Sequence, residues 1–131
     1  MENYKLLLIK TDGHIQCIDS PKIPKLETLQ QLIDGFIEVM YCKRRYIFLV
    51  NDEGAINASR YNAVASILQA EGIYGPTCSI FGDVVVAIDD DEDIRAMTED
   101  EYNAFLDWSA DVCMSVYCDK AEMLAEIESD T

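Results

Sequence analysis

The chain has 131 residues, half of them hydrophobic, and a formal net charge of −15 at pH 7. A chain of this length with this composition can bury one core, so we expect a single domain over residues 1–131. Its strongly apolar runs, Leu6–Ile9 and Val84–Ile88, are much shorter than the roughly twenty residues of a membrane helix. The N-terminal residues lack the features of a secretory signal. We therefore expect a cytoplasmic protein with no membrane partner.

The charge is concentrated at the C-terminal end. Residues 89–131 contain fifteen acidic and two basic side chains, whereas residues 1–88 contain ten acidic and eight basic ones. This asymmetry concerns partners and solubility rather than the fold. It disfavours direct nucleic-acid binding and favours either a solvated surface or a surface for a basic partner. We expect a near-neutral body, 1–88, and an acidic helical extension, 89–131, docked on it.

The first part of the chain predicts two hairpins separated by a helix. Tyr4–Lys10 and His14–Asp19 are strand-like and flank a Thr-Asp-Gly turn. An apolar stripe from Leu26 to Ile33 then indicates a short helix, with Gly35 as the glycine that follows its end. Phe36–Tyr41 and Tyr46–Val50 predict the second hairpin, with Lys43, Arg44 and Arg45 as an exposed basic tip.

The middle of the chain predicts a helix and a further hairpin. Ser59 is placed to cap a helix from Arg60 to Ala70, with Tyr61 on its buried side. Thr77–Phe81 and Asp83–Ile88 resemble two strands that turn at Gly82.

The acidic segment predicts a long helix. Thr98 and Glu101 match a capping box, in which each side chain accepts a hydrogen bond from the backbone of the other residue. An apolar stripe follows, and a second short helix is expected near Met123. The stripe consists of Tyr102, Phe105, Leu106, Ser109, Val112, Cys113, Val116 and Tyr117. We expect an α+β fold with an antiparallel or mixed sheet of about five to six strands, packed by the middle helix and the long C-terminal helix.

No residue pattern identifies a catalytic site, a metal site or a cofactor. The five cysteines lack metal or redox spacing, and we expect reduced thiols, with Cys17, Cys42 and Cys78 packed as small hydrophobic groups. The run Asp89–Asp93 imitates the start of a calcium loop. It lacks the glycine at position six and the glutamate at position twelve that such a loop needs, so we expect a solvated turn.

The acidic helix offers a candidate partner-binding face. Asp100, Asp107 and Asp111 are expected on the solvent side, and Trp108 away from the main apolar stripe. Exposed carboxylates can imitate phosphates and occupy the basic groove of a DNA-binding protein. Trp108 would suit an interface anchor, although it could equally pack under the C-terminal segment.

A second candidate is a small ligand pocket. Asn51, Asn62, Tyr74 and Gly75 lie near the two ends of the middle helix. If they converge, amide groups and an aromatic ring would form a polar pocket. Turn formation is a simpler explanation for the asparagines.

Four short motifs carry a family resemblance. They are Gly35–Val39 after a leucine-rich helix, Asn51–Gly54 at the end of a strand, Asn62, and Ile73–Pro76 before a closing hairpin. Over about residues 4–90 the chain resembles the bacterial and phage family called domain of unknown function 3846. The resemblance implies a phage or conjugative element and supplies no catalytic residues. The acidic segment after Ile88 is larger than the resemblance leads us to expect.

Two functional hypotheses from different classes follow. The first is a non-enzymatic binding protein of a phage or conjugative element, acting on a basic or DNA-binding protein through its acidic helical face, with DNA mimicry as the most specific form. The second is a small-ligand or nucleotide-binding module. An unrecognised enzyme ranks third, because carboxylates alone can catalyse.

Overall fold

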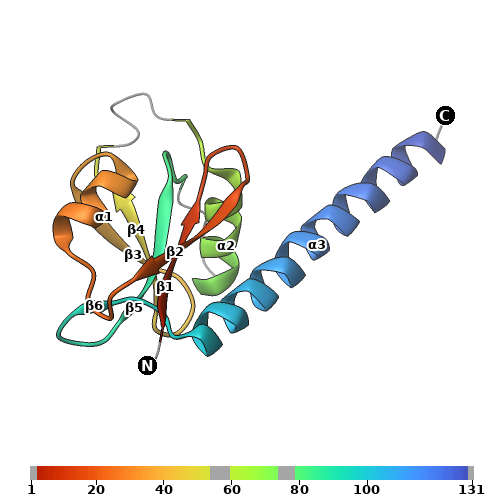
Figure 1. Cartoon of the computed structure of the whole chain (residues 1–131). Coiled ribbons are helices and arrows are strands. Elements are labelled where there is room, and N and C mark those ends of the chain that lie inside the picture. The colour runs from red at the N-terminus through yellow and green to blue at the C-terminus, as the bar shows by residue number, and fades with distance from the viewer. Residues whose placement is uncertain (1–2, 54–59, 74–78, 130–131) are drawn as a thin grey trace.

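The computed structural model describes residues 3–53, 60–73 and 79–129, with side chains described as far as Met114. The fold is α+β, and Figure 1 shows its elements along the chain. The strands are β1 (Tyr4–Ile9), β2 (Ile15–Ser20), β3 (Ile37–Tyr41), β4 (Tyr46–Asn51), β5 (Val84–Asp89) and β6 (Ile94–Arg95). The helices are α1 (Leu26–Ile33), α2 (Ala63–Ile73) and α3 (Glu99–Ser129).

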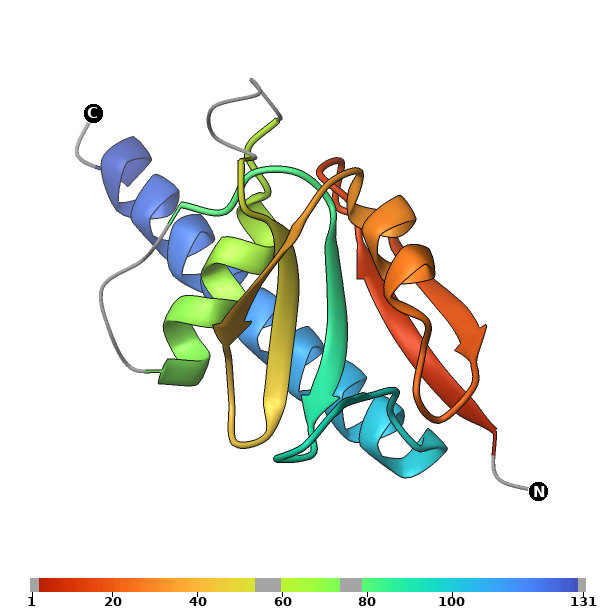
Figure 2. The ribbon, with the colours of Figure 1, turned by 90° about the vertical axis from the view of Figure 1, so that its left-hand side faces the viewer.

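The strands form one antiparallel sheet in the order β2-β1-β5-β4-β3, with β6 paired to β5. Figure 2 shows β5 at the centre, between β1 and β4. The sequence of β5 explains this place, because Val84–Ile88 is an unbroken apolar run and all five side chains are buried. A strand that is apolar on both sides needs a covered sheet on both sides.

Helices cover the two faces of the sheet. Alternate side chains of a strand point to opposite faces, so each inner strand contributes to two cores. On one face α1 inserts Leu29 and Ile33 among Leu6, Leu8, Ile47, Leu49, Val85 and Ala87. On the other face α2 and α3 insert Ala65, Leu68 and Phe105 among Leu7, Ile9, Phe48, Val50, Val84, Val86 and Ile88.

The predicted hairpin across Gly82 is wrong. The described residues between α2 and Gly82, 79–81, contain no strand, and Phe81 forms only an isolated bridge with Tyr61. β5 instead pairs with β1 and β4, because only the sheet centre buries both of its faces. Thr77 and Cys78, which the prediction included, lie outside the described residues.

The boundaries of the later helices also differ from expectation. α2 begins at Ala63 rather than Arg60, and Tyr61 is 47% exposed rather than buried. Ser59, the predicted cap, lies outside the described residues. α3 runs without interruption to Ser129, so the separate helix expected near Met123 is wrong.

α3 packs on the sheet through its first half. Its predicted stripe is confirmed as far as its side chains are described, since Phe105 and Ser109 are buried and Tyr102, Leu106, Val112 and Cys113 pack against the core. Beyond this region the helix continues past the body of the molecule (Figure 1). Within the described ranges, no helix combines the length and hydropathy needed to cross a membrane.

The end of α1 is held against the end of β4. Asp34, not the predicted Gly35, adopts the left-handed conformation, with φ of 59°, and the Gly35 amide donates to the Gln30 carbonyl at 3.1 Å. The Asn51 Nδ2 donates to the Asp34 carbonyl at 2.9 Å, and Asn51 Oδ1 accepts from the Glu53 amide at 2.9 Å. A Cβ at Gly35 would lie only 2.8 Å from the Asn51 Cγ, so glycine is needed for this close approach.

This contact predicts non-additive substitutions. Gly35→Ala should lower the free energy of unfolding by about 2 kcal/mol, because the added methyl group meets Asn51. Asn51→Ala should lower it by about 1 kcal/mol, through two exposed hydrogen bonds. The double variant should be more stable than the sum of the two losses predicts, since the shorter side chain at position 51 leaves room for the methyl group. Urea denaturation of the four proteins measures the coupling, and strict additivity would contradict the packing described.

Candidate functional site

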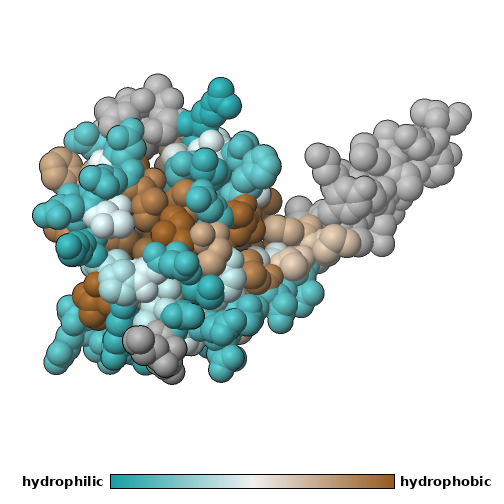
Figure 3. All heavy atoms as spheres, viewed as in Figure 1, coloured by the Kyte–Doolittle hydropathy of each residue, from teal (hydrophilic) through white to brown (hydrophobic). Residues whose placement is uncertain are grey.

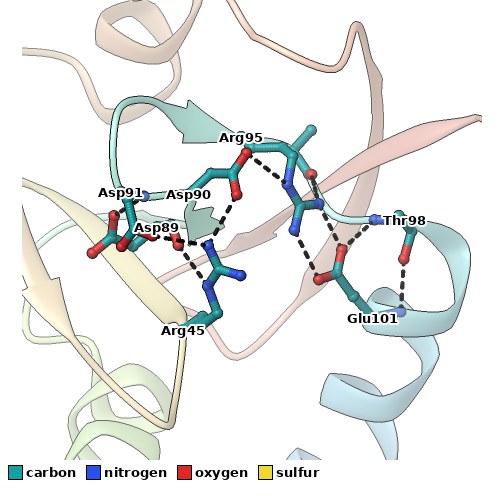
Figure 4. A network of polar contacts seen from close by, with 8 residues as sticks. Arg45, Asp89, Asp90, Asp91, Arg95, Thr98 and Glu101 are labelled. Carbon is teal, nitrogen blue, oxygen red and sulfur yellow. Dashed lines mark hydrogen bonds and ion pairs between the residues drawn. The ribbon is translucent and has the colours of Figure 1, made fainter.

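Two groups can be distinguished among the described acidic residues from Asp89 onward, and the first group is bonded to two arginines (Figure 4). Arg45 donates from Nη2 to the Asp90 carboxylate at 2.9 Å and from Nε to the Asp89 carbonyl at 3.0 Å. The Asp91 amide donates to the Asp89 side chain at 3.0 Å, and Asp91 itself has φ of 65°. The acidic run therefore forms a turn between β5 and β6 whose charge is partly compensated by the neighbouring hairpin.

Arg95 joins this turn to the start of α3. Its side chain is only 11% exposed, and its guanidinium makes two hydrogen bonds to the Glu101 carboxylate, at 2.7 and 3.0 Å. It also lies 3.7 Å from the Asp90 carboxylate. The hydrogen bond from Arg95 is the main cause that lowers the pKa of Glu101 to about 2. Bidentate pairs of this kind have a fixed geometry, so Arg95 orients the first turn of α3.

The predicted capping box is confirmed in both directions. The Thr98 amide donates to Glu101 Oε1 at 2.9 Å, and the Glu101 amide donates to Thr98 Oγ1 at 3.2 Å (Figure 4). Glu101 thus serves the cap and the ion pair at once. The sequence analysis predicted only the cap. The ion pair between Arg95 and Glu101 could have been indicated by one signal, because Arg95 is the one basic residue between Asp89 and Asp119.

Trp108 anchors α3 to the turn between β3 and β4. Its ring packs on Phe105, with centroids 5.6 Å apart, and Lys43 Nζ lies 5.0 Å from the ring centroid. The expectation that Trp108 points away from the apolar stripe is wrong, because the residue lies at the border of the stripe and packs against the core. The basic tip of this hairpin is likewise not simply exposed, since Lys43 and Arg45 both contact the acidic segment.

The second group of acids lies on the side of α3 that faces away from its apolar stripe. Asp100, Asp107 and Asp111 are exposed. Among the described residues, none of the three has an ion pair or a side-chain hydrogen bond. At 100° per residue they fall within about 40° of one another around the helix. They thus form a narrow line of carboxylates parallel to the axis of α3, which we call the acidic line.

Of the two described residues that were predicted to bind a ligand, Asn51 and Asn62, only Asn51 lines a recess. Asn51 lines a recess of about 300 Å³ between the end of α1 and the start of β5. Asn62 is not among its lining residues, and Tyr74 and Gly75 lie outside the described residues. The sequence did not single out the other polar residues of the recess, which are Thr11, Asp34, Arg60 and Asp83. They come from four separate segments, so no spacing could have indicated them.

Asn62 is engaged entirely within the fold. Its side chain is fully buried, and its Nδ2 donates to the carbonyls of Ile9 at 3.0 Å and Gly82 at 2.9 Å. Its Oδ1 accepts from the Ala65 amide at 3.1 Å, which makes Asn62 the cap of α2. The residue therefore joins the end of β1, the start of β5 and α2.

The cysteines differ in burial. Cys42 is buried, and burial raises the pKa of its thiol to about 12. Cys17 is exposed, so its predicted packing as a small hydrophobic group is wrong; β2 is an edge strand whose outer residues face solvent. Across the part of the chain that is described, no three histidine, cysteine or acidic side chains are grouped as a metal site would require.

The Glu101 pair predicts a pH-dependent contribution to stability. Because the pKa of Glu101 is lowered in the folded protein, its contribution is complete above the ordinary value of 4.5 and is lost as pH falls toward about 2. Glu101→Gln keeps the cap but removes the charge, and should cost about 2 kcal/mol at pH 7 after allowance for the partial exposure of the pair. Urea denaturation from pH 7 to 2.5 should show this difference shrinking. Asp107→Asn, which removes an unpaired carboxylate, should show a difference near zero throughout.

Asn62 predicts a large structural effect. Asn62→Ala leaves two carbonyls without their donor and removes the cap of α2, so the free energy of unfolding should fall by about 3 kcal/mol. Asn103→Ala, at an exposed position of α3, should change it by about 0.5 kcal/mol or less. Both are measured by chemical denaturation. A similar small effect for the two variants would show that the buried network contributes little.

In a comparison with protein families, residues 4–109 match the family described as "Domain of unknown function (DUF3846)". The match extends beyond the resemblance seen in the sequence and includes the acidic turn, Arg95 and the first turns of α3. Neither the curated proteins nor the solved structures contain a match to this chain. The family model covers most of the chain, and the protein therefore belongs to the DUF3846 family.

Proposed function

We propose that this chain is a non-enzymatic binding protein of a phage or conjugative element, and that it binds a basic surface of a protein partner through the acidic line of α3. The observation that carries the proposal is the contrast between the two groups of acids. Asp90 and Glu101 form ion pairs with Arg45 and Arg95, whereas the three acids of the acidic line are exposed and unpaired among the described residues.

The acidic line is presented on a fixed element. The Arg95–Glu101 pair holds the first turn of α3, and Trp108 joins its third turn to Lys43. A rigid charged surface loses little conformational freedom on binding, so more of its electrostatic attraction is available for affinity. A solvated face that serves solubility alone has no need of such fixation.

The spacing of the carboxylates suits a DNA mimic. With a rise of 1.5 Å per residue, Asp100 and Asp107 are about 10.5 Å apart along the axis, and Asp107 and Asp111 about 6 Å. Phosphates rise by about 3.4 Å per nucleotide along one strand, so these intervals correspond to about three and two steps. We infer a DNA-binding protein as the partner class.

Capture experiments test this function. Immobilised protein is incubated with a bacterial lysate, and bound DNA-binding proteins are eluted with rising salt and, separately, with duplex DNA. We expect elution between about 0.1 and 0.5 M salt, because screening weakens exposed charge pairs, and competition by DNA. Capture that resists both salt and DNA would contradict mimicry.

A matched pair of triple variants locates the binding surface. The first neutralises the acidic line (Asp100→Asn, Asp107→Asn, Asp111→Asn). The control removes the same charge from exposed acids of the body (Glu27→Gln, Asp52→Asn, Glu71→Gln). The first variant should reduce capture at least about tenfold, and the control about twofold or less. Both variants lose the same long-range attraction, but only the first loses the direct contacts of the acidic line with the partner. Equal losses would mean that only net charge matters.

The recess at Asn51 favours a second candidate function, the binding of a small polar ligand. Its lining combines one cation, Arg60, with the carboxylates of Asp34 and Asp83. Such a mixture suits a neutral or zwitterionic molecule better than a nucleotide, whose phosphates would meet two like charges. Ligand-observed NMR with a library of amino acids, nucleosides and nucleotides tests it. Binding that Arg60→Ala abolishes and Asn103→Ala preserves would support this function, and no binding would remove it.

A further inference from the structure

We propose that the outer edge of β3 binds a second copy of this chain, forming an antiparallel β3–β3 pair centred on Val39. This interaction is independent of the acidic line. It would join two sheets into one continuous sheet across a dimer.

The free backbone groups of β3 can be identified from its pairing with β4. The Asp52 amide donates to the Phe36 carbonyl, and the Cys42 amide donates to the Tyr46 carbonyl. In an antiparallel ladder the residues that bond inward alternate with residues whose amide and carbonyl groups point outward. Ile37, Val39 and Tyr41 are therefore the residues with outward groups. β3 is the last strand of the sheet, and no described strand pairs with its outer side.

The side chains of the same three residues are apolar. Ile37 packs at the border of the α1 core, whereas Val39 is 40% exposed and Tyr41 59% exposed. Phe36, just before the strand, is 70% exposed. A sheet edge with exposed apolar side chains and unpaired backbone groups is a template for pairing with another strand.

The residues of β3 match a second copy in register. With a two-fold axis at Val39, Val39 faces its own copy, Ile37 faces Tyr41, and Glu38 faces Met40. Each outward backbone group then meets a partner, apolar pairs stack on one side, and the only charged side chain, Glu38, opposes an uncharged one. One outward group is already used in part: the Tyr41 carbonyl accepts a long hydrogen bond, 3.4 Å, from Gln69 Nε2. A carbonyl has a second lone pair and can accept another donor.

The opposite edge of the sheet does not match itself in this way. In β2 the Lys10 amide donates to His14, so Ile15, Cys17 and Asp19 carry the outward groups. A two-fold pair at Cys17 would set Ile15 against Asp19, whose carboxylate lies 3.7 Å from Lys5 Nζ. Charged residues of this kind protect a sheet edge from pairing. Figure 3 views this β2 side, where hydrophilic residues border the apolar ones.

Sedimentation equilibrium of the full chain tests the dimer. We expect reversible dimerisation below about 1 mM. Because each copy carries a net charge of −15, raising the salt concentration should tighten the dimer. Salt weakens binding through the acidic line, so the two interactions are distinguished by the sign of this effect.

Variants locate the interface. Val39→Lys places two ammonium groups opposite each other and should raise the dimer dissociation constant at least about tenfold. Ile15→Lys, the same change on the β2 edge, should alter it about twofold or less. Circular dichroism confirms that both variants fold. A wild-type chain that is monomeric up to about 1 mM, or a dimer that Val39→Lys leaves unchanged, would overturn the proposal.

Amide hydrogen exchange of the wild-type chain gives a readout that needs no variant. The Val39 amide should exchange slowly at concentrations where the dimer forms and rapidly on dilution, whereas the outward Cys17 amide should exchange rapidly at both. Rapid exchange of Val39 in the dimer would place the interface elsewhere and overturn the proposal.

Discussion

Burial of β5 on both of its faces is the constraint from which the arrangement of the other elements follows. Five consecutive apolar side chains, Val84–Ile88, are excluded from water, which requires a strand on each side and a helical layer above and below. β1 and β4 supply the strands, while α1 supplies one layer and α2 with α3 the other. The hairpins β1–β2 and β3–β4 are thereby separated, and each leaves one outer strand at an edge.

Charge compensation determines how the acidic segment can fold at all. Its carboxylates repel one another unless cations neutralise some of them. Arg45 and Arg95 do so for Asp90 in the turn, and Arg95 also for Glu101 at the start of α3. Among the described acids of α3, Asp100, Asp107 and Asp111 lie on its solvent side, where water screens their repulsion. The segment thus begins with carboxylates that are paired with arginines and continues with exposed carboxylates that have no cationic partner among the described residues. This division is what gives the proposed partner-binding face a defined orientation.

Local signals in the sequence predicted much of the fold. The capping box at Thr98, the apolar stripe of α3 and the two N-terminal hairpins depend on residues close in the chain, and their periodicities are strong. The partner of β5 could not be predicted, because an apolar run fits a hairpin and a central strand equally well and only the assembled sheet distinguishes them. The start of α2 was missed for a related reason. Its cap is Asn62, whose amide bonds to Ile9 and Gly82, and such distant partners leave no periodic trace.

The candidate sites also divide into features that depend on residues close in the chain and features that depend on distant ones. Helical spacing placed Asp100, Asp107 and Asp111 together on the solvent side, and the structure describes them there. The environment of Trp108 could not be read from its own helix, because Lys43 comes from a hairpin far away in the sequence. The recess at Asn51 is assembled from separate segments, so its composition appears only after folding.

The buried network of Asn62 has a consequence for comparing members of this family. A polar side chain that satisfies three backbone groups from three segments cannot be exchanged for a residue of another shape without leaving one of them unpaired. An alignment in which this column is invariant would therefore record a requirement of the chain topology. Read as a catalytic signature, the same column would misdirect the assignment of activity across every member of the family.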